Sequence, residues 1–324
     1  MTSNAREAAR CKSFRKSKET TKAEGLASDS ENEVAISRIT RMTDELTKKV
    51  ERAVKLIQAA GKVAEEHGQP LEICYSGGKD SDVILELAKM SGIKFRAIYR
   101  NTTIDPPGTI KHCRDNGVEV VQPKLTFRQV LEKVGLPSRY RRACCDHLKE
   151  YKILDYAVIG VRRDESKKRA ERYKEPELCR VYKHKQRQRQ YLPILEWTAQ
   201  DITDFIEERD IKCHPLYYDE DGNFHVEKRL GCMGCPLASR KQRMGEFIRN
   251  PKMVRFYIKG AQKYMDTHPQ SKVHKAFKDA CEWFTFTIYC DNMREFQEKF
   301  GSNLFDDGID CKAHLEKTFG ITLP

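Results

Sequence analysis

The segment of sequence SGGKDS at residues 76–81 combines residue types that bind phosphate. Its two glycines let the backbone approach an anion closely, and successive N–H groups at the start of a following helix would point at it. The serines and the lysine add donors and positive charge, and Asp80 could hold the Mg²⁺ that accompanies a polyphosphate. The spacing differs from that of the Walker loop. Lys79 and Asp80 are the candidate catalytic residues, and the candidate phosphate ligands are Ser76, Gly77, Gly78, Lys79, Asp80 and Ser81.

Four cysteines form two close pairs that could bind a metal. Cys144 and Cys145 are adjacent at the start of a predicted helical stretch, and Cys232 and Cys235 are separated by two residues. Four thiolates can hold an iron–sulfur cluster or a zinc ion. Adjacent cysteines are unusual in structural zinc sites, and a larger cubane could relieve the strain between them. The spacing favours a [4Fe–4S] cluster, with zinc as one alternative and a metal-free set of thiols as another.

Two arginines are candidates for contact with an anionic substrate. Arg162 and Arg163 follow directly on a predicted strand, and their planar guanidinium groups suit an anion. Asp164 and Glu165 come next, so the arginines could instead pair with these carboxylates. We favour contact with a substrate anion.

The elements that would position these residues alternate between strands and helices. Five apolar runs between residues 71 and 195 are typical of buried strands, and helical patterns separate them. This alternation predicts an α/β fold with a parallel, Rossmann-like sheet. Ligands of such sheets bind beyond the carboxyl ends of the strands, where SGGKDS begins. The predicted strands are Leu71–Tyr75, Phe95–Tyr99, Val118–Val121, Tyr156–Val161 and Tyr191–Leu195.

The pattern divides the chain into four predicted segments. Residues 1–36 have too little apolar content to fold and are predicted to be a disordered leader. An amphipathic helix is predicted over residues 37–68. A nucleotide-binding domain follows over residues 69–212, and a cysteine-containing, mainly helical C-terminal region over residues 213–324.

Three local features refine this division. The polar stretch Arg162–Arg189 reads as a long mobile loop. Thr198 and Asp201 form a capping pair that starts a helix running to about Arg209. Two long helices are predicted in the C-terminal region, over Pro251–Tyr264 and His274–Phe296.

Composition limits the class of protein. The 324 residues carry a net charge of +12, which suits anionic partners such as nucleotides and nucleic acid. The mean hydropathy of −0.71 and the lack of an 18-residue apolar run argue against a membrane span. The first residues show no apolar signal region, so we expect a cytoplasmic protein. Its twelve cysteines are then expected to be reduced thiols, some of them bound to metal.

Several motifs resemble those of known enzymes. The SGGKDS string after a strand resembles the PP-loop of ATP pyrophosphatases, which adenylate a substrate and release pyrophosphate. The Cys-Cys…Cys-x-x-Cys set is similar to that of assimilatory adenylyl-sulfate reductases, where it holds a [4Fe–4S] cluster. Four later motifs resemble the phosphoadenosine-phosphosulfate (PAPS) reductase family in the same order. They are GVRRDES at 160–166, PILEW at 193–197, HPLY at 214–217 and RLGC at 229–232.

Two features depart from the sulfonucleotide reductases of this family. Those enzymes carry a nucleophilic cysteine in a Glu-Cys-Gly context near the C-terminus, whereas Cys311 lies between an aspartate and a lysine. Their phosphate loop is degenerate, whereas this one is intact. Intact loops occur in the smaller subunit of sulfate adenylyltransferase and in the iron–sulfur, sulfur-transfer component of DNA phosphorothioation.

The resemblance implies an enzyme that binds ATP and Mg²⁺, adenylates a substrate, releases pyrophosphate and takes part in sulfur transfer. DNA or RNA is the candidate acceptor, and a cysteine desulfurase or another sulfur donor is the candidate partner. One alternative is a reductase that converts adenylyl sulfate or phosphoadenylyl sulfate to sulfite. Another is a non-catalytic regulator that binds nucleotide and nucleic acid.

Overall fold

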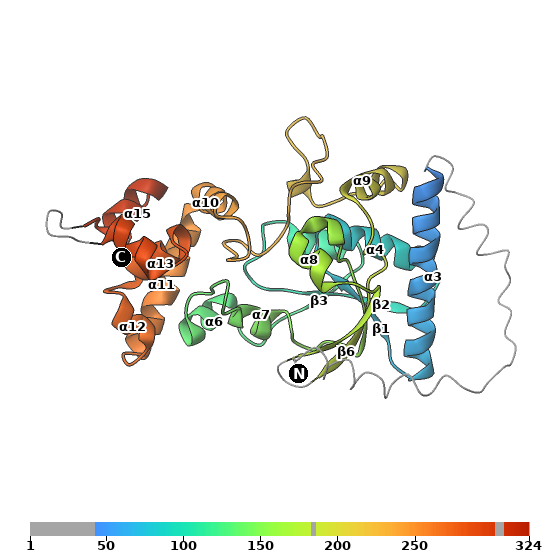
Figure 1. The fold of residues 1–324 in the computed structure, drawn as a ribbon, viewed down its shortest axis with the longest axis horizontal. Coiled ribbons are helices and arrows are strands. Elements are labelled where there is room, and N and C mark those ends of the chain that lie inside the picture. The colour runs from blue at the N-terminus through green and yellow to red at the C-terminus, as the bar shows by residue number, and fades with distance from the viewer. Residues whose placement is uncertain (1–42, 183–185, 302–307, 324) are drawn as a thin grey trace, which may run out of the picture. The chain divides into compact units, whose positions relative to one another are not determined.

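The computed structural model describes residues 43–182, 186–301 and 308–323 (Figure 1). The predicted leader and the first residues of the predicted N-terminal helix lie outside this range. The chain divides into two compact units, and each is discontinuous in sequence. Among the described residues, one unit comprises 43–74, 79–97, 154–182 and 186–212, and the other comprises 75–78, 98–153, 213–301 and 308–323. The domain boundaries suggested by the sequence stay predictions.

A six-stranded sheet carries the fold, in the strand order β3-β2-β1-β4-β6-β5. β1 pairs with β4, β4 with β6 and β2 with β3 in parallel, while β5 is antiparallel to β6. The predicted α/β class with a largely parallel sheet is confirmed. Chain order reverses between β1 and β4, which makes the carboxyl ends of these two strands the topological switch point. The strands are β1 (Leu71–Tyr75), β2 (Phe95–Arg100), β3 (Glu119–Val121), β4 (Tyr156–Ile159), β5 (Glu177–Val181) and β6 (Arg187–Tyr191).

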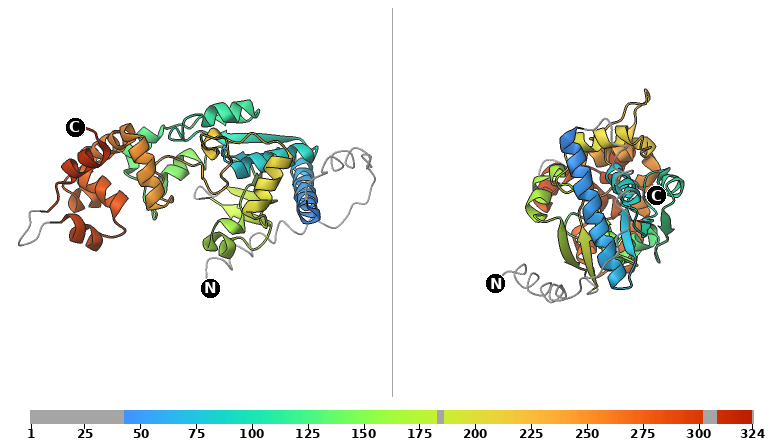
Figure 2. Two further views of the ribbon diagram at one scale, coloured as in Figure 1. Left: turned by 90° about the horizontal axis from the view of Figure 1, so that it is seen from above. Right: turned by 90° about the vertical axis from the view of Figure 1, so that its right-hand side faces the viewer.

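The N-terminal helix α3 (Asp44–Glu66) packs against the first unit through the predicted apolar stripe, which includes Leu46, Val50 and Ile57. It contacts β4, β6 and α4 (Lys79–Met90), and Figure 2 shows it running past these strands. Lys49 of α3 forms a 2.8 Å ion pair with Asp201 of α9 (Ala199–Glu208). Asp201 also completes the predicted capping box with Thr198.

Two predictions in the first unit are wrong. The last predicted strand, Tyr191–Leu195, is displaced, because β6 ends at Tyr191. The predicted mobile loop Arg162–Arg189 instead contains η2 (Arg163–Glu165), α8 (Lys167–Arg172) and the β5–β6 pair. Its strands escaped hydropathy analysis because they bury polar side chains. Gln188 and Gln190 are buried and bond to each other at 2.8 Å and to the Tyr182 hydroxyl.

The second unit is mainly helical, and the helical C-terminal region predicted from the sequence is confirmed. The predicted helix His274–Phe296 is wrong, since the chain turns extended at Phe277 and Cys290. Asp279 and Asn292 then accept backbone N–H bonds and start new helices. The helices are α5 (Thr109–Asp115), α6 (Phe127–Val134), α7 (Ala143–Leu148), α10 (Arg240–Arg249), α11 (Pro251–Thr267), α12 (Lys272–Ala276), α13 (Ala280–Tyr289), α14 (Met293–Phe300) and α15 (Cys311–Phe319).

An aromatic core holds these helices together. Phe247 of α10 makes edge contacts with Tyr257 of α11 and Phe284 of α13. Trp283 is buried in the same core and lies against Tyr264. In the part of the chain that the structure describes, no helix is long and apolar enough to cross a membrane.

Candidate active site

The phosphate loop joins a buried strand directly to a helix. β1 ends at Tyr75 and α4 begins at Lys79, as the sequence predicts. Gly77 has φ +77°, and a Cβ there would lie 3.0 Å from Thr109 Cγ2. A Cβ on Gly78 would lie 3.2 Å from the Tyr217 hydroxyl. The positive φ of Gly77 favours glycine there, and a side chain at Gly78 would crowd Tyr217.

Asp80 is held by two cations of the first unit. Arg162 Nε donates to Asp80 Oδ1 at 2.6 Å, and Lys79 Nζ lies 3.1 Å from Asp80 Oδ2. Arg162 is only 4% exposed and also contacts Asp164 and the Trp197 carbonyl. Lys79 and Ser81 are buried as well. The carboxylate predicted to hold Mg²⁺ is thus fixed in orientation at the helix start, and its role as a ligand stays a prediction.

Gly160 allows β4 to approach the loop. A Cβ on Gly160 would lie 3.0 Å from the carbonyl oxygen of Asp80. This closeness brings Arg162, two residues further on, to the Asp80 side chain. The Arg163 side chain does not bond to Asp80. It donates to the carbonyls of Tyr173 and Lys174 and pairs with Glu196. Contact of either arginine with a substrate anion stays a prediction.

In the second unit, HPLY lies against the residues that begin the loop. The sequence left His214 unassigned, yet it is 2% exposed and its Nδ1 accepts the Leu216 N–H at 3.1 Å. Burial and the neighbouring His112 lower its pKa, which favours the neutral form of the imidazole. Tyr217 packs by its hydroxyl against Gly78 and accepts the Leu230 N–H. The only sequence signal for His214 and Tyr217 was the resemblance of the HPLY motif to the PAPS reductase family.

The structure gathers the four predicted metal-binding cysteines in the second unit. Cys144 and Cys145 open α7, and Cys232 and Cys235 lie on a turn closed by a 3.2 Å backbone bond. All four thiols are half-buried. A hydrogen bond with Cys145, burial and the charges of Cys232 and Cys235 all raise the pKa of Cys144. Such mutual effects require the four sulfurs to lie in one neighbourhood.

Two cations and a hydroxyl group lie beside the thiols. The Cys144 thiol lowers the pKa of Cys145, and Lys149 and Arg142 lower it further. Burial raises the pKa of Cys232 to about 11, and Lys149 opposes this shift. The Cys232 thiol donates to the Thr102 hydroxyl at 3.5 Å. Positive charge beside the sulfurs favours their anionic, ligand-binding form.

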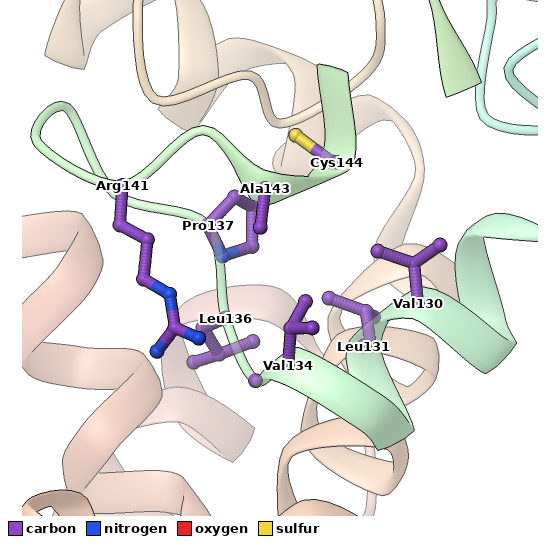
Figure 3. A pocket seen from close by; sticks show the side chains of 9 residues that line it. Val130, Leu131, Val134, Leu136, Pro137, Arg141, Ala143 and Cys144 are labelled. Carbon is purple, nitrogen blue, oxygen red and sulfur yellow. The ribbon is translucent and has the colours of Figure 1, made fainter. Parts of the chain in front are cut away.

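The other flank of Cys144 is apolar. A pocket between α6 and α7 is lined by Val130, Leu131 and Val134, and Cys144 borders it (Figure 3). The pocket has no space for a water molecule. An apolar flank of this kind limits solvent access to a metal–thiolate centre.

The sequence predicts an iron–sulfur cluster at these four thiols, with a zinc ion as the alternative, and both stay predictions. Zinc needs four ligands about 2.0–2.3 Å from one point. Across residues 43–182, 186–301 and 308–323, no three His, Cys, Asp or Glu side chains are arranged to hold one metal ion. A [4Fe–4S] cluster binds each thiolate to a different iron, so its sulfurs stand further apart. The cluster itself stays a prediction.

The sheet, its switch point and the intact loop define an α/β protein of the PP-loop type. The family model described as the phosphoadenosine phosphosulfate reductase domain matches residues 70–238, which is more than half of the chain. The chain therefore belongs to the PAPS reductase family, as the motifs predicted. The match includes both cysteine pairs and Arg162.

Curated relatives include enzymes of sulfur metabolism. The chain is 26% identical over 278 residues to sulfate adenylyltransferase subunit 2 of Halorhodospira halophila, covering 69% of this chain and 86% of that protein. It is 28% identical over 221 residues to an uncharacterized protein of Methanocaldococcus jannaschii. That match covers 64% of this chain and spans half of the relative's length.

A solved structure of phosphoadenylyl-sulfate reductase from Candida auris is similar at 14% identity and a TM-score of 0.36, covering 65% of this chain and 98% of that one. FMN adenylyltransferase from Candida glabrata is similar at 14% identity and a TM-score of 0.37, covering 58% and 67%.

Proposed function

We propose that the protein binds ATP with Mg²⁺ at Ser76–Ser81, adenylates a substrate and releases pyrophosphate. The observation that carries this proposal is the intact loop at the switch point, with Asp80 fixed by Arg162 and Lys79. Family membership and the similarity to sulfate adenylyltransferase subunit 2 support nucleotide chemistry.

The positive charge of the loop suits adenylation, in which a negatively charged pyrophosphate leaves. An oxygen of the substrate attacks the α-phosphorus of ATP, the bond to the bridging oxygen breaks, and pyrophosphate leaves with its electron pair. The N-terminus of α4 and Lys79 stabilise the negative charge on this leaving group. Mg²⁺, held with the help of Asp80, would add to the same effect. A sulfur nucleophile then attacks the substrate atom that bears this oxygen, and the bond from that atom to the oxygen breaks, so that the oxygen leaves as part of AMP.

We propose that Cys144, Cys145, Cys232 and Cys235 hold a [4Fe–4S] cluster that takes part in the sulfur transfer. Their shared neighbourhood and the adjacent cations support this assignment. Such a cluster would supply electrons or a binding place for sulfur. A cysteine desulfurase, or another protein that delivers sulfur, fits as partner.

A nucleic acid is the proposed acceptor. Cationic side chains contact phosphates. Within residues 163–182 and 186–191, five exposed carboxylates accompany five exposed cations. The cations are Lys167, Lys168, Arg172, Lys174 and Arg187.

The environment of the Cys311 thiol argues against reduction of a sulfonucleotide as the function. This thiol is 5% exposed at the start of α15, and burial raises its pKa to about 11. A nucleophilic cysteine needs an accessible thiolate at neutral pH, which this environment opposes.

The test is pyrophosphate release from Mg-ATP by anaerobically purified protein, with and without DNA or RNA. Asp80→Ala should abolish release, whereas Asp115→Ala, on an exposed carboxylate of α5, should not change it. Stimulation by one nucleic acid would identify the acceptor class. No release by protein that binds ATP, with either nucleic acid and a desulfurase present, would contradict adenylation.

A further inference from the structure

Tyr140 of the second unit is the most exposed of the large hydrophobic residues in the part of the chain that the structure describes. It is 94% exposed, whereas the next of these residues, Ile248, is 56% exposed. Single exposed apolar residues are common on protein surfaces, so the surroundings of this ring decide whether it has a role.

Tyr140 lies in a tight turn whose backbone is held in place. The Ser138 N–H donates to the Arg141 carbonyl at 3.1 Å, and the Arg141 N–H donates to the Ser138 hydroxyl at 3.0 Å. Arg139 Nε donates to the Pro236 carbonyl at 3.1 Å, which ties the turn to a segment 97 residues further along the chain. A fixed backbone therefore presents the ring, so a ligand that binds it has little further chain to order.

Three arginines flank the ring without acidic partners. Arg139, Arg141 and Arg142 are exposed, and among the described residues no carboxylate forms an ion pair with any of them. The nearest carboxylates along the chain are Glu132, which is engaged in an ion pair within α6, and Asp146, which is half-buried in α7. The turn therefore carries uncompensated positive charge beside an open aromatic face.

An exposed ring between cations suits a ligand in which negative charges alternate with flat rings. Guanidinium groups bind phosphates, and an aromatic side chain stacks on the open face of an unpaired base. In a duplex, neighbouring base pairs cover these faces, so Tyr140 would have no base to stack on. An acidic peptide would satisfy the arginines but would leave the ring without a specific partner. The chemistry of the turn therefore favours a single strand of nucleic acid.

We infer that the turn at residues 138–142 binds single-stranded nucleic acid, with a base stacked on Tyr140 and phosphates at Arg141 and Arg142. The inference rests on the nucleic-acid acceptor of the proposed function and narrows that acceptor to an unpaired strand. Arg142 directly precedes α7, which carries Cys144 and Cys145. A strand bound at the turn is thereby held near the thiols of the same unit.

The test is fluorescence anisotropy with labelled oligonucleotides, supplied as single strands of DNA and RNA and as the corresponding duplexes. Tyr140→Ala should weaken the binding of single strands about 5- to 100-fold, because it removes the stacking of one base. Tyr140→Trp should keep the affinity within about threefold of wild type, since a ring remains. Ile309→Ala is the matched control and should not change the affinity, because Ile309 is 46% exposed but precedes a carboxylate, Asp310.

Arg141→Gln tests the phosphate contact. It should weaken the binding of all sequences alike and reduce the slope of log affinity against log salt concentration by about 0.7. Arg294→Gln, at an exposed arginine of α14 that pairs with Glu298, should leave this slope unchanged. A wild-type slope in Arg141→Gln would contradict the phosphate contact assigned to the turn.

Thermal melting reports folding, and Tyr140→Ala should melt as wild type does because the ring is exposed. Wild-type affinity for single strands in folded Tyr140→Ala would overturn the inference and leave the nucleic-acid acceptor intact. An equal loss of duplex binding in this variant would overturn the stacking on an unpaired base. Wild-type protein that binds neither strand nor duplex would overturn both the acceptor and this inference. Pyrophosphate release, measured separately, would still decide the adenylation.

Discussion

Arg162 Nε donates a 2.6 Å hydrogen bond to Asp80 Oδ1, and this bond links the residues that follow two neighbouring parallel strands. Asp80 lies in the first turn of the helix after β1, and Arg162 lies just beyond β4. Because Arg162 is almost fully buried, the pair is weakly screened by water. The arginine thereby sets where the Asp80 carboxylate points.

Arg162→Gln should lower kcat/KM for pyrophosphate release about 10- to 100-fold. A hydrogen bond between charged groups contributes about 1.5–3 kcal/mol, and its loss would free the Asp80 side chain. Arg162→Lys should recover part of the activity. Arg294→Gln is the control, because Arg294 is exposed on α14, where it pairs with Glu298, and its loss should change the rate less than threefold. Equal losses in both variants would contradict the assigned role of Arg162.

Gly160→Ala should destabilise the protein by about 1–3 kcal/mol, because its Cβ would lie 3.0 Å from the Asp80 carbonyl, a backbone atom that cannot rotate away. Gly231→Ala is the matched control, since no atom lies within 4 Å of a Cβ at that position. Urea unfolding of both variants measures the difference. Equal stability would show that the strand and the loop can separate without cost.

Asp201→Asn should destabilise the protein by about 1–2 kcal/mol at pH 7. Burial would raise the pKa of Asp201, but hydrogen bonds from Lys49 and Thr198 lower it below 3.8. A carboxylate with a lowered folded pKa stabilises the protein above its unfolded pKa, and this stabilisation disappears as pH falls through the folded value. The difference between wild type and variant should therefore shrink below about pH 4.

Unfolding at several pH values measures this effect. Asp115→Asn breaks the exposed pair with Lys111 and should cost less than about 0.5 kcal/mol. A cost for Asp201→Asn that stays constant down to pH 2 would assign it to packing or capping instead of the ion pair.

Cys235→Ser should reduce the iron and sulfide retained after reconstitution by more than half, because one of four ligands is lost. Cys311→Ser should change neither iron content nor pyrophosphate release, since this thiol is buried in α15. Iron and sulfide assays on both variants provide the comparison. Formation of sulfite from adenylyl sulfate by the wild type, and its loss in Cys311→Ser, would favour sulfonucleotide reduction.

The sequence by itself predicted the features that depend on neighbouring residues. SGGKDS joins a strand to a helix as expected, because an apolar run, two glycines and a helical pattern follow one another. Adjacent cysteines open a helix, and Thr198 with Asp201 starts another. Each of these patterns reflects a local backbone preference or a periodic burial, which the order of residue types records directly.

Only the tertiary structure decided which distant side chains meet. The buried glutamines of β6 satisfy one another and Tyr182, so polar residues fill a place that hydropathy assigned to a loop. Arg162 meets Asp80 because β4 lies beside β1 in the sheet. Arg243 of α10 is buried against α13, where it donates to the Thr287 carbonyl. Such pairings depend on strand order and helix packing. The same local patterns are compatible with several strand orders, so no local pattern reveals which distant side chains meet.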